Sequence, residues 1–229
     1  MRTRRDCGPP DLIVKHNIHI DLVDGDKPNL AFNRTLYRAV QEDHFEVLKV
    51  LVAIGPDSPH STISQDIIKN KVFEWAINFD RPDVVEHLLN AVTLPDMGLC
   101  LASQLGRPEI VKRLISAGAD LGSTNGSEGP SPMIATIGRG NFDIVELLLE
   151  AGAPVNVKHG ETSPLHEAVH EGDVTMVKRL ISAGVDLHHE AQTLVGLETA
   201  LQLAYRRQGK LPPESPQLRI YSEINKALE

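Results

Sequence analysis

The chain has 229 residues, of which 41% are hydrophobic and 24% charged, a balance typical of a folded globular protein. Its formal net charge is −8, so nonspecific binding to nucleic acid, whose phosphates require a basic surface, is not expected. Two cysteines, Cys7 and Cys100, are too few for a disulfide framework. They predict free thiols in a reducing compartment, the cytoplasm or the nucleus.

Residues 1–33 are predicted to form a leader and an N-terminal cap. The opening MRTRRDCGPPD has basic residues with no apolar run behind them, so a signal peptide is not expected. No apolar run in the chain reaches the roughly 20 residues that a membrane-spanning helix needs, so no membrane association is predicted. Residues 11–32 alternate like a strand around a DGD turn, and we expect a strand-like cap there.

An internal repeat then extends over residues 34–210. The sequence VKRLISAG occurs at 111–118 and again at 177–184, 66 residues apart, which is twice a period of 33. VELLLEAG lies between the copies, and weaker relatives lie at 48–55 and 85–92. Each has apolar residues at i, i+3 and i+4, the pattern of a helix with one buried face. Repetition at this period predicts a stacked solenoid.

A shorter helix is predicted before each of these segments. Ser163 is suited to cap one such helix and Pro164 to open it, while Gly172 is suited to end it. The sequence therefore predicts an all-α repeat solenoid of helix–turn–helix units. Residues 211–229, which follow as a Pro-rich linker and a polar helix, are predicted to cap the stack.

The paired-helix unit resembles the ankyrin repeat, whose pattern is T-P-L-H-x-A-A-x-x-G followed by V-x-x-L-L-x-x-G-A. Residues 163–166 read SPLH, and the resemblance is strongest over 97–190. It covers residues 34–210 as about six units with short or missing hairpins. The positions of the first helices that match the family pattern are Ala39, Ala76, Ala102, Thr136, Ala168 and Ala204. The resemblance implies an adaptor that binds another protein or a peptide in a concave groove. No cofactor is implied, and the chain is expected to be a monomer on its own.

One pentapeptide, HEAVH at 166–170, matches the H-E-x-x-H pattern of zinc proteases. The resemblance instead gives His166 a structural role, in which its ring bonds Ser163 and backbone groups between repeats. We therefore expect no catalytic residue and no metal ligand here. The alternative is an enzyme or small-molecule-binding protein with a pocket on the degenerate scaffold, in which His170 and Glu167 transfer protons.

The repeat register also predicts the residues that face a partner. Four of them are apolar where the family pattern has polar residues and are the expected anchors: Trp75, Phe79, Leu101 and Leu105. The same side chains could instead pack internally. Charged positions further along are expected to tune selectivity, unless they are simply solvated: Arg139, Glu167, His170 and Glu171, followed by Arg206 and Arg207.

Overall fold

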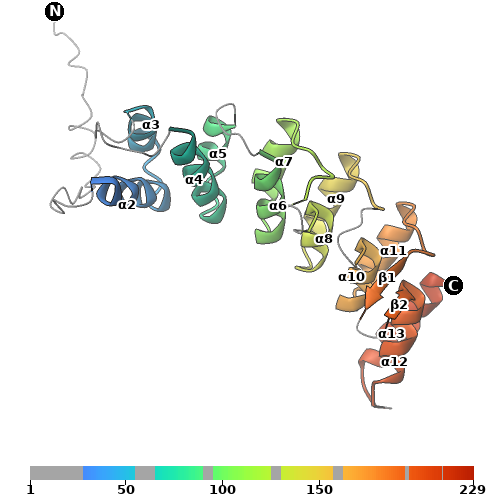
Figure 1. Ribbon diagram of the computed structural model, residues 1–229. Helices are drawn as coiled ribbons and strands as arrows, with labels where there is room; N and C mark the ends of the chain where they lie inside the picture. Colours follow the sequence, from blue (N-terminus) through green and yellow to red (C-terminus); the bar gives the residue numbers. More distant parts are fainter. Residues whose placement is uncertain are drawn as a thin grey trace, which may run out of the picture. The chain divides into compact units, whose positions relative to one another are not determined.

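The computed structural model describes residues 28–54, 65–89, 95–124, 130–156, 162–193, 196–212 and 214–229 (Figure 1). They belong to two compact units, Met1–Gly98 and Leu99–Glu229, and each unit is described by itself. The described residues form twelve helices and one two-stranded sheet. The predicted all-α repeat solenoid is confirmed, with one hairpin added.

The first unit consists of helix pairs. Its helices are α2 (Pro28–Gln41), α3 (Phe45–Ile54), α4 (Gln65–Asn78) and α5 (Pro82–Leu88), followed by the first residues of α6 (Pro95–Leu105). Helix α2 packs against α3, α4 packs against α5, and α2 and α4 contact each other. The buried side chains recur with helical spacing, as Val72, Phe73, Ala76 and Ile77 do on α4, so each helix turns one apolar face to its neighbours.

The strand predicted at the N-terminus is wrong for residues 28–32, which are the first residues of α2. Pro28 suits the first turn of a helix, where an N–H has no partner to lose. Further along α2, Leu36, Ala39 and Val40 are buried with helical spacing, which overrides the short alternation before them. Residues 11–27 lie outside the described residues, and the predicted domain boundaries after 33 and 210 stay predictions.

The second unit continues the helix pairs and ends in a hairpin and a last pair. After the rest of α6 come α7 (Pro108–Ser116), α8 (Pro132–Ile137), α9 (Phe142–Glu150), α10 (Pro164–Glu171), α11 (Val174–Ser182), β1 (Glu190–Thr193), β2 (Gly196–Thr199), α12 (Ala200–Gly209) and α13 (Gln217–Leu228). Strands β1 and β2 are antiparallel, with Glu190 opposite Thr199. Helix α13 packs against α11 and α12 and buries Tyr221, Ile224 and Leu228.

The repeat register predicted from the sequence holds in six helices. Helices α2, α4, α6, α8, α10 and α12 carry the six equivalent positions, and all six side chains are at most 1% exposed: Ala39, Ala76, Ala102, Thr136, Ala168 and Ala204. Small side chains at these positions allow adjacent helices to approach closely. The sequence therefore located the first helix of every unit correctly.

The turns inside the helix pairs differ between the two units. Where the second unit has Gly106, Gly140 and Gly172 with φ between 69° and 72°, the first has Asp43 at 62° and Asp80 at 57°. An L-residue in this left-handed region carries a steric penalty that glycine avoids. The two aspartates are therefore points of backbone strain in the first unit.

Side chains of one helix pair bind the carbonyl groups that end the first helix of the preceding pair. Arg81 Nη2 donates to the Gln41 carbonyl at 2.7 Å, and Asn141 Nδ2 donates to the Ser103 carbonyl at 3.3 Å. The last four carbonyls of a helix have no partner within it, so these bonds both satisfy helix ends and tie neighbouring repeats together.

Candidate functional site

An aromatic cluster of Tyr37, Trp75 and Phe79 lies on α2 and α4. The ring centroid of Tyr37 is 5.3 Å from that of Trp75 and 5.2 Å from that of Phe79, with interplanar angles of 87° and 74°. Both contacts are edge-to-face, the arrangement that aromatic quadrupoles favour. Tyr37 is 38% exposed, and Trp75 and Phe79 are half-buried. The cluster is therefore packed on one side and open to solvent on the other.

The sequence pattern predicts Trp75 and Phe79 as anchors but does not indicate Tyr37. The repeat register places groove positions of α2 at Arg38 and its helical neighbours, one residue beyond Tyr37. The tyrosine takes part because its ring reaches across from α2 to α4. The signal in the sequence was an aromatic residue next to a predicted groove position, in the first helix of the unit that precedes the only Trp of the chain.

The other predicted anchors, Leu101 and Leu105, lie on the part of α6 that belongs to the second unit. Leu101 is half-buried, and Leu105 is 38% exposed. Their combination with Trp75 and Phe79 into one apolar surface stays a prediction.

Two of the predicted selectivity residues lie near the junction of α8 and α10. Arg139, just after α8, is exposed, and Glu167 on α10 is half-buried. Glu167 Oε1 lies 2.7 Å from the position that a Cβ atom on Gly138 would occupy. The glycine therefore leaves room for the Glu167 carboxylate between the two helices.

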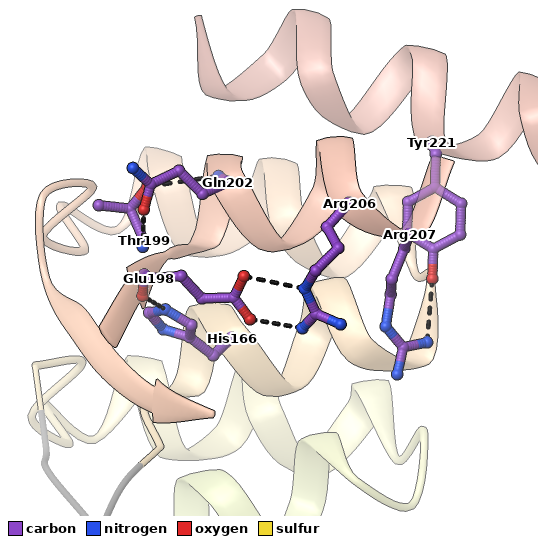
Figure 2. Close-up of polar contacts among 7 residues, drawn as sticks. All are labelled: His166, Glu198, Thr199, Gln202, Arg206, Arg207 and Tyr221. Carbon is purple, nitrogen blue, oxygen red and sulfur yellow. Dashed lines mark hydrogen bonds and ion pairs between the residues drawn. The ribbon is translucent and has the colours of Figure 1, made fainter. Parts of the chain in front are cut away.

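His166 is the centre of a buried polar network (Figure 2). The side chain is 3% exposed, and its Nδ1 lies 2.8 Å from Ser163 Oγ and its Nε2 2.9 Å from the Glu198 carbonyl oxygen. A carbonyl oxygen only accepts hydrogen bonds, so Nε2 carries the proton and Nδ1 accepts from the Ser163 hydroxyl. Burial lowers the pKa of His166, outweighing the opposing effect of the Glu198 carbonyl, which agrees with a neutral ring.

The predicted structural role of His166 is thus confirmed. Ser163 also caps α10, since its Oγ accepts from the His166 backbone N–H at 3.4 Å. His189, from the segment after α11, lies edge-on against the His166 ring at 5.9 Å between centroids. Both ring nitrogens of His166 are already bonded, and within the described ranges no group of three or more His, Cys, Asp and Glu side chains is arranged to hold a metal ion.

Glu198 connects this network to α12. Its buried carboxylate accepts from Arg206 Nε at 3.0 Å and from Arg206 Nη2 at 2.5 Å (Figure 2). Thr199 and Gln202 form a reciprocal capping box that starts α12 directly after the strand. The sequence placed Arg206 after the selectivity residues along the groove. In the structure, the Glu198 carboxylate of the same repeat binds its guanidinium.

His170 and Glu171 lie at the end of α10. Their side chains are 57% and 45% exposed, and His170 Nδ1 lies 3.0 Å from Glu171 Oε1. His170 pairs with Glu171, and Glu167 lies beside Gly138. The alternative in which His170 and Glu167 transfer protons stays a hypothesis.

Arg207 ties the end of α10 to α13. Its Nη1 donates to the His170 carbonyl at 2.9 Å. The same nitrogen donates to Tyr221 Oη at 3.2 Å (Figure 2), and the Tyr221 hydroxyl donates to the Val169 carbonyl at 3.3 Å. His170, Arg207 and Tyr221 border an open pocket of about 350 Å³ between the ends of α10 and α12 and the start of α13.

This architecture defines the class of a helical repeat protein, with successive helix pairs in a common register. A family model described as ankyrin repeats, three copies, matches residues 99–191. The chain is similar to cyclin-dependent kinase 4 inhibitor B of Rattus norvegicus, with 36% identity over 94 residues that cover 40% of this chain and 71% of that protein. The chain belongs to the ankyrin-repeat family, whose repeats are protein-interaction domains.

A further relative and a solved structure show similarity to the chain. The ankyrin repeat and KH domain-containing protein mask-1 of Caenorhabditis elegans is 29% identical over 169 residues, which are 69% of this chain but only 6% of that protein. The crystal structure of the ankyrin repeat domain of Bcl-3 matches with a TM-score of 0.65 at 24% identity, covering 89% of this chain and 87% of that one. Among the helices described here, none has the length and hydropathy needed to span a membrane.

Proposed function

We propose that the chain is a non-enzymatic adaptor that binds a partner protein or peptide through the exposed side of its first helices. The observation that carries this proposal is the aromatic cluster. Three aromatic rings from two adjacent repeats remain partly open to solvent, although α2 and α4 bury other apolar side chains. Large aromatic side chains dominate the binding energy of protein interfaces.

The name of the rat relative supports a protein ligand, because an inhibitor of a cyclin-dependent kinase acts on another protein. In this proposal Trp75 and Phe79, together with Tyr37, anchor the partner in the first unit, and Leu101 and Leu105 add apolar contacts from α6. The charged residues Arg139, Glu167, His170 and Glu171 then discriminate between partners. A preformed surface on rigid helices loses little conformational entropy on binding.

Affinity purification of the tagged chain, followed by mass spectrometry, tests the proposal. A Trp75→Ser/Phe79→Ser variant should lose the proteins that the unchanged chain retains by at least about tenfold, because two hot-spot aromatics commonly contribute more than 1.4 kcal/mol. Leu197→Ser, which removes an apolar side chain that is 65% exposed on β2, is the matched control and should retain them. Circular dichroism must show that both variants are folded.

Equal retention by the Trp75→Ser/Phe79→Ser variant and the unchanged chain would refute the role of the cluster. That outcome would favour the alternative in which Trp75 and Phe79 serve internal packing, and the thermal unfolding temperature of the variant would then fall.

A further inference from the structure

We propose that the pocket beside α12 and α13 binds a carboxylate group of an acidic segment in a partner protein, with Arg207 and Lys210 as the cationic ligands. The proposal rests on the adaptor function in one respect, because it takes the ligand to be part of a protein. The pocket lies entirely within the second unit and is lined by described residues from three helices.

The geometry of the arginines in this unit points to a carboxylate. Arg179 holds Glu146 through Nε at 2.6 Å and Nη2 at 2.8 Å, and Arg206 holds Glu198 through the same two nitrogens. This edge of a guanidinium matches the two oxygens of a carboxylate. The chain thus uses the same edge twice to bind an acidic side chain.

Arg207 differs from these two arginines in the edge that it uses. Arg207 donates hydrogen bonds to the His170 carbonyl and to Tyr221 Oη, and both bonds come from Nη1. Within the described residues, its Nε–Nη2 edge has no recorded partner, so that edge can accept a ligand without breaking a bond of the fold. The Nη1 bonds hold the guanidinium in place, which lowers the entropy that binding costs.

Charge in the pocket supports a single negative group. Lys210, at the end of α12, is exposed and adds a second cation. Glu171 is the carboxylate among the lining residues and lies 3.0 Å from His170, while Arg206 is neutralised by Glu198. Arg207 and Lys210 carry two positive charges against the one negative charge of Glu171, and one carboxylate balances the difference. This basic pocket contrasts with a chain whose net charge is −8.

The apolar residues that line the pocket indicate which side chain lies next to the bound carboxylate in the partner segment. Leu211 and Ile220 line the pocket, and Ile220 is 37% exposed. A volume of about 350 Å³ is near the lower limit of ligand pockets and suits one or two side chains. The segment that fits is an Asp or Glu next to an aliphatic residue.

Nuclear magnetic resonance of the full chain provides a direct test, because the Nε–H groups of Arg206 and Arg207 can be assigned by substitution. The probe is acetyl-Leu-Glu-amide, compared with acetyl-Leu-Gln-amide and with inorganic phosphate. We expect a saturable shift of the Arg207 Nε–H with the Glu probe and little with the Gln probe. The Arg206 Nε–H, already bound to Glu198, should stay unchanged.

Two charge reversals complete the test. Lys210→Glu should lower the affinity for the Glu probe about tenfold, as expected for a nearby charge at a partly solvated site. Lys178→Glu makes the same change on the exposed side of α11 and should lower it less than twofold. Equal shifts with the Glu and Gln probes, binding of phosphate without the Glu probe, or an unchanged affinity in Lys210→Glu would each overturn the proposal.

The outcome is separable from that of the adaptor experiment. Trp75→Ser/Phe79→Ser alters the other unit and should leave the dipeptide titration unchanged, whether or not the aromatic cluster binds a partner.

Discussion

Replacing His166 with Ala tests whether the His166 ring joins the fifth and sixth repeats. The substitution removes the ring that bridges Ser163 and the Glu198 carbonyl at a position only 3% exposed. An unpaired buried carbonyl costs about 1–3 kcal/mol, and the lost serine bond costs about 1 kcal/mol. Loss of packing adds roughly 1 kcal/mol. The free energy of unfolding should therefore fall by about 3–5 kcal/mol.

Urea denaturation followed by circular dichroism measures this change. Fluorescence of Trp75, which lies in the first unit, reports on that unit separately. His170→Ala is the matched control, because it removes the same residue type from the same helix where the side chain is 57% exposed. Its effect should stay within about 0.5 kcal/mol. A cost below about 1 kcal/mol for His166→Ala would refute the reasoning that its two bonds join the repeats.

The same ring predicts a dependence on pH. Burial lowers the pKa of His166 in the folded chain below the 6.5 of an unperturbed histidine. As the pH falls below 6.5, the unfolded chain takes up a proton that the folded chain does not, so stability decreases. In His166→Gln this contribution is absent, and the difference in unfolding free energy between the two proteins should shrink from pH 7.5 to pH 5.5. A difference that stays constant would contradict the neutral buried ring.

Three other substitutions test separate features of the fold. Asp80→Gly should raise the free energy of unfolding by about 0.5–1 kcal/mol. Relief of the left-handed conformation contributes about 1–2 kcal/mol, which outweighs the greater entropy of glycine in the unfolded chain. An unchanged urea midpoint would argue against strain at φ 57°. Gly98→Ala should lower the thermal unfolding temperature, because the added Cβ would lie 2.5 Å from the buried ring of Phe73 on α4. Gly209→Ala is the control, since open space surrounds that position, and it should leave the temperature unchanged. Equal unfolding temperatures for the two variants would show that the Phe73 ring moves aside. Glu146→Gln should cost about 0.5–1 kcal/mol at pH 7. The hydrogen bonds from Arg179 lower the pKa of Glu146 below 4.5, so that cost should disappear as the pH falls below this value, and a cost that persists at pH 3 would contradict the ion pair.

Local features of the fold were predictable from the sequence because they depend on short-range chemistry. Ser163 and Pro164 start α10, and Gly172 ends it with a φ of 72°. The copied sequence VKRLISAG gives α7 and α11 the same buried face, including Leu114 and Leu180. Periodicity and helix capping act within a few residues, so a single sequence contains the information that they require.

Features that depend on contacts between repeats were not predictable in the same way. Tyr37 joins the aromatic cluster across two helices, and Arg206 reaches a carboxylate on the preceding strand. The predicted strand at residues 28–32 was wrong because alternation over a few residues is weaker than the helical burial of the following turns. In each case the deciding partner is distant in sequence or lies on another element.

Glu198 explains why two adjacent arginines have different roles. Its carbonyl oxygen accepts from His166, which fixes the end of β2 against α10. The same residue presents its buried carboxylate to Arg206, whose Nε and Nη2 donate to it. Arg207, one position further round α12, turns toward the His170 carbonyl and the pocket instead. The histidine that resembles a zinc ligand in the sequence thus helps to position the carboxylate that Arg206 binds.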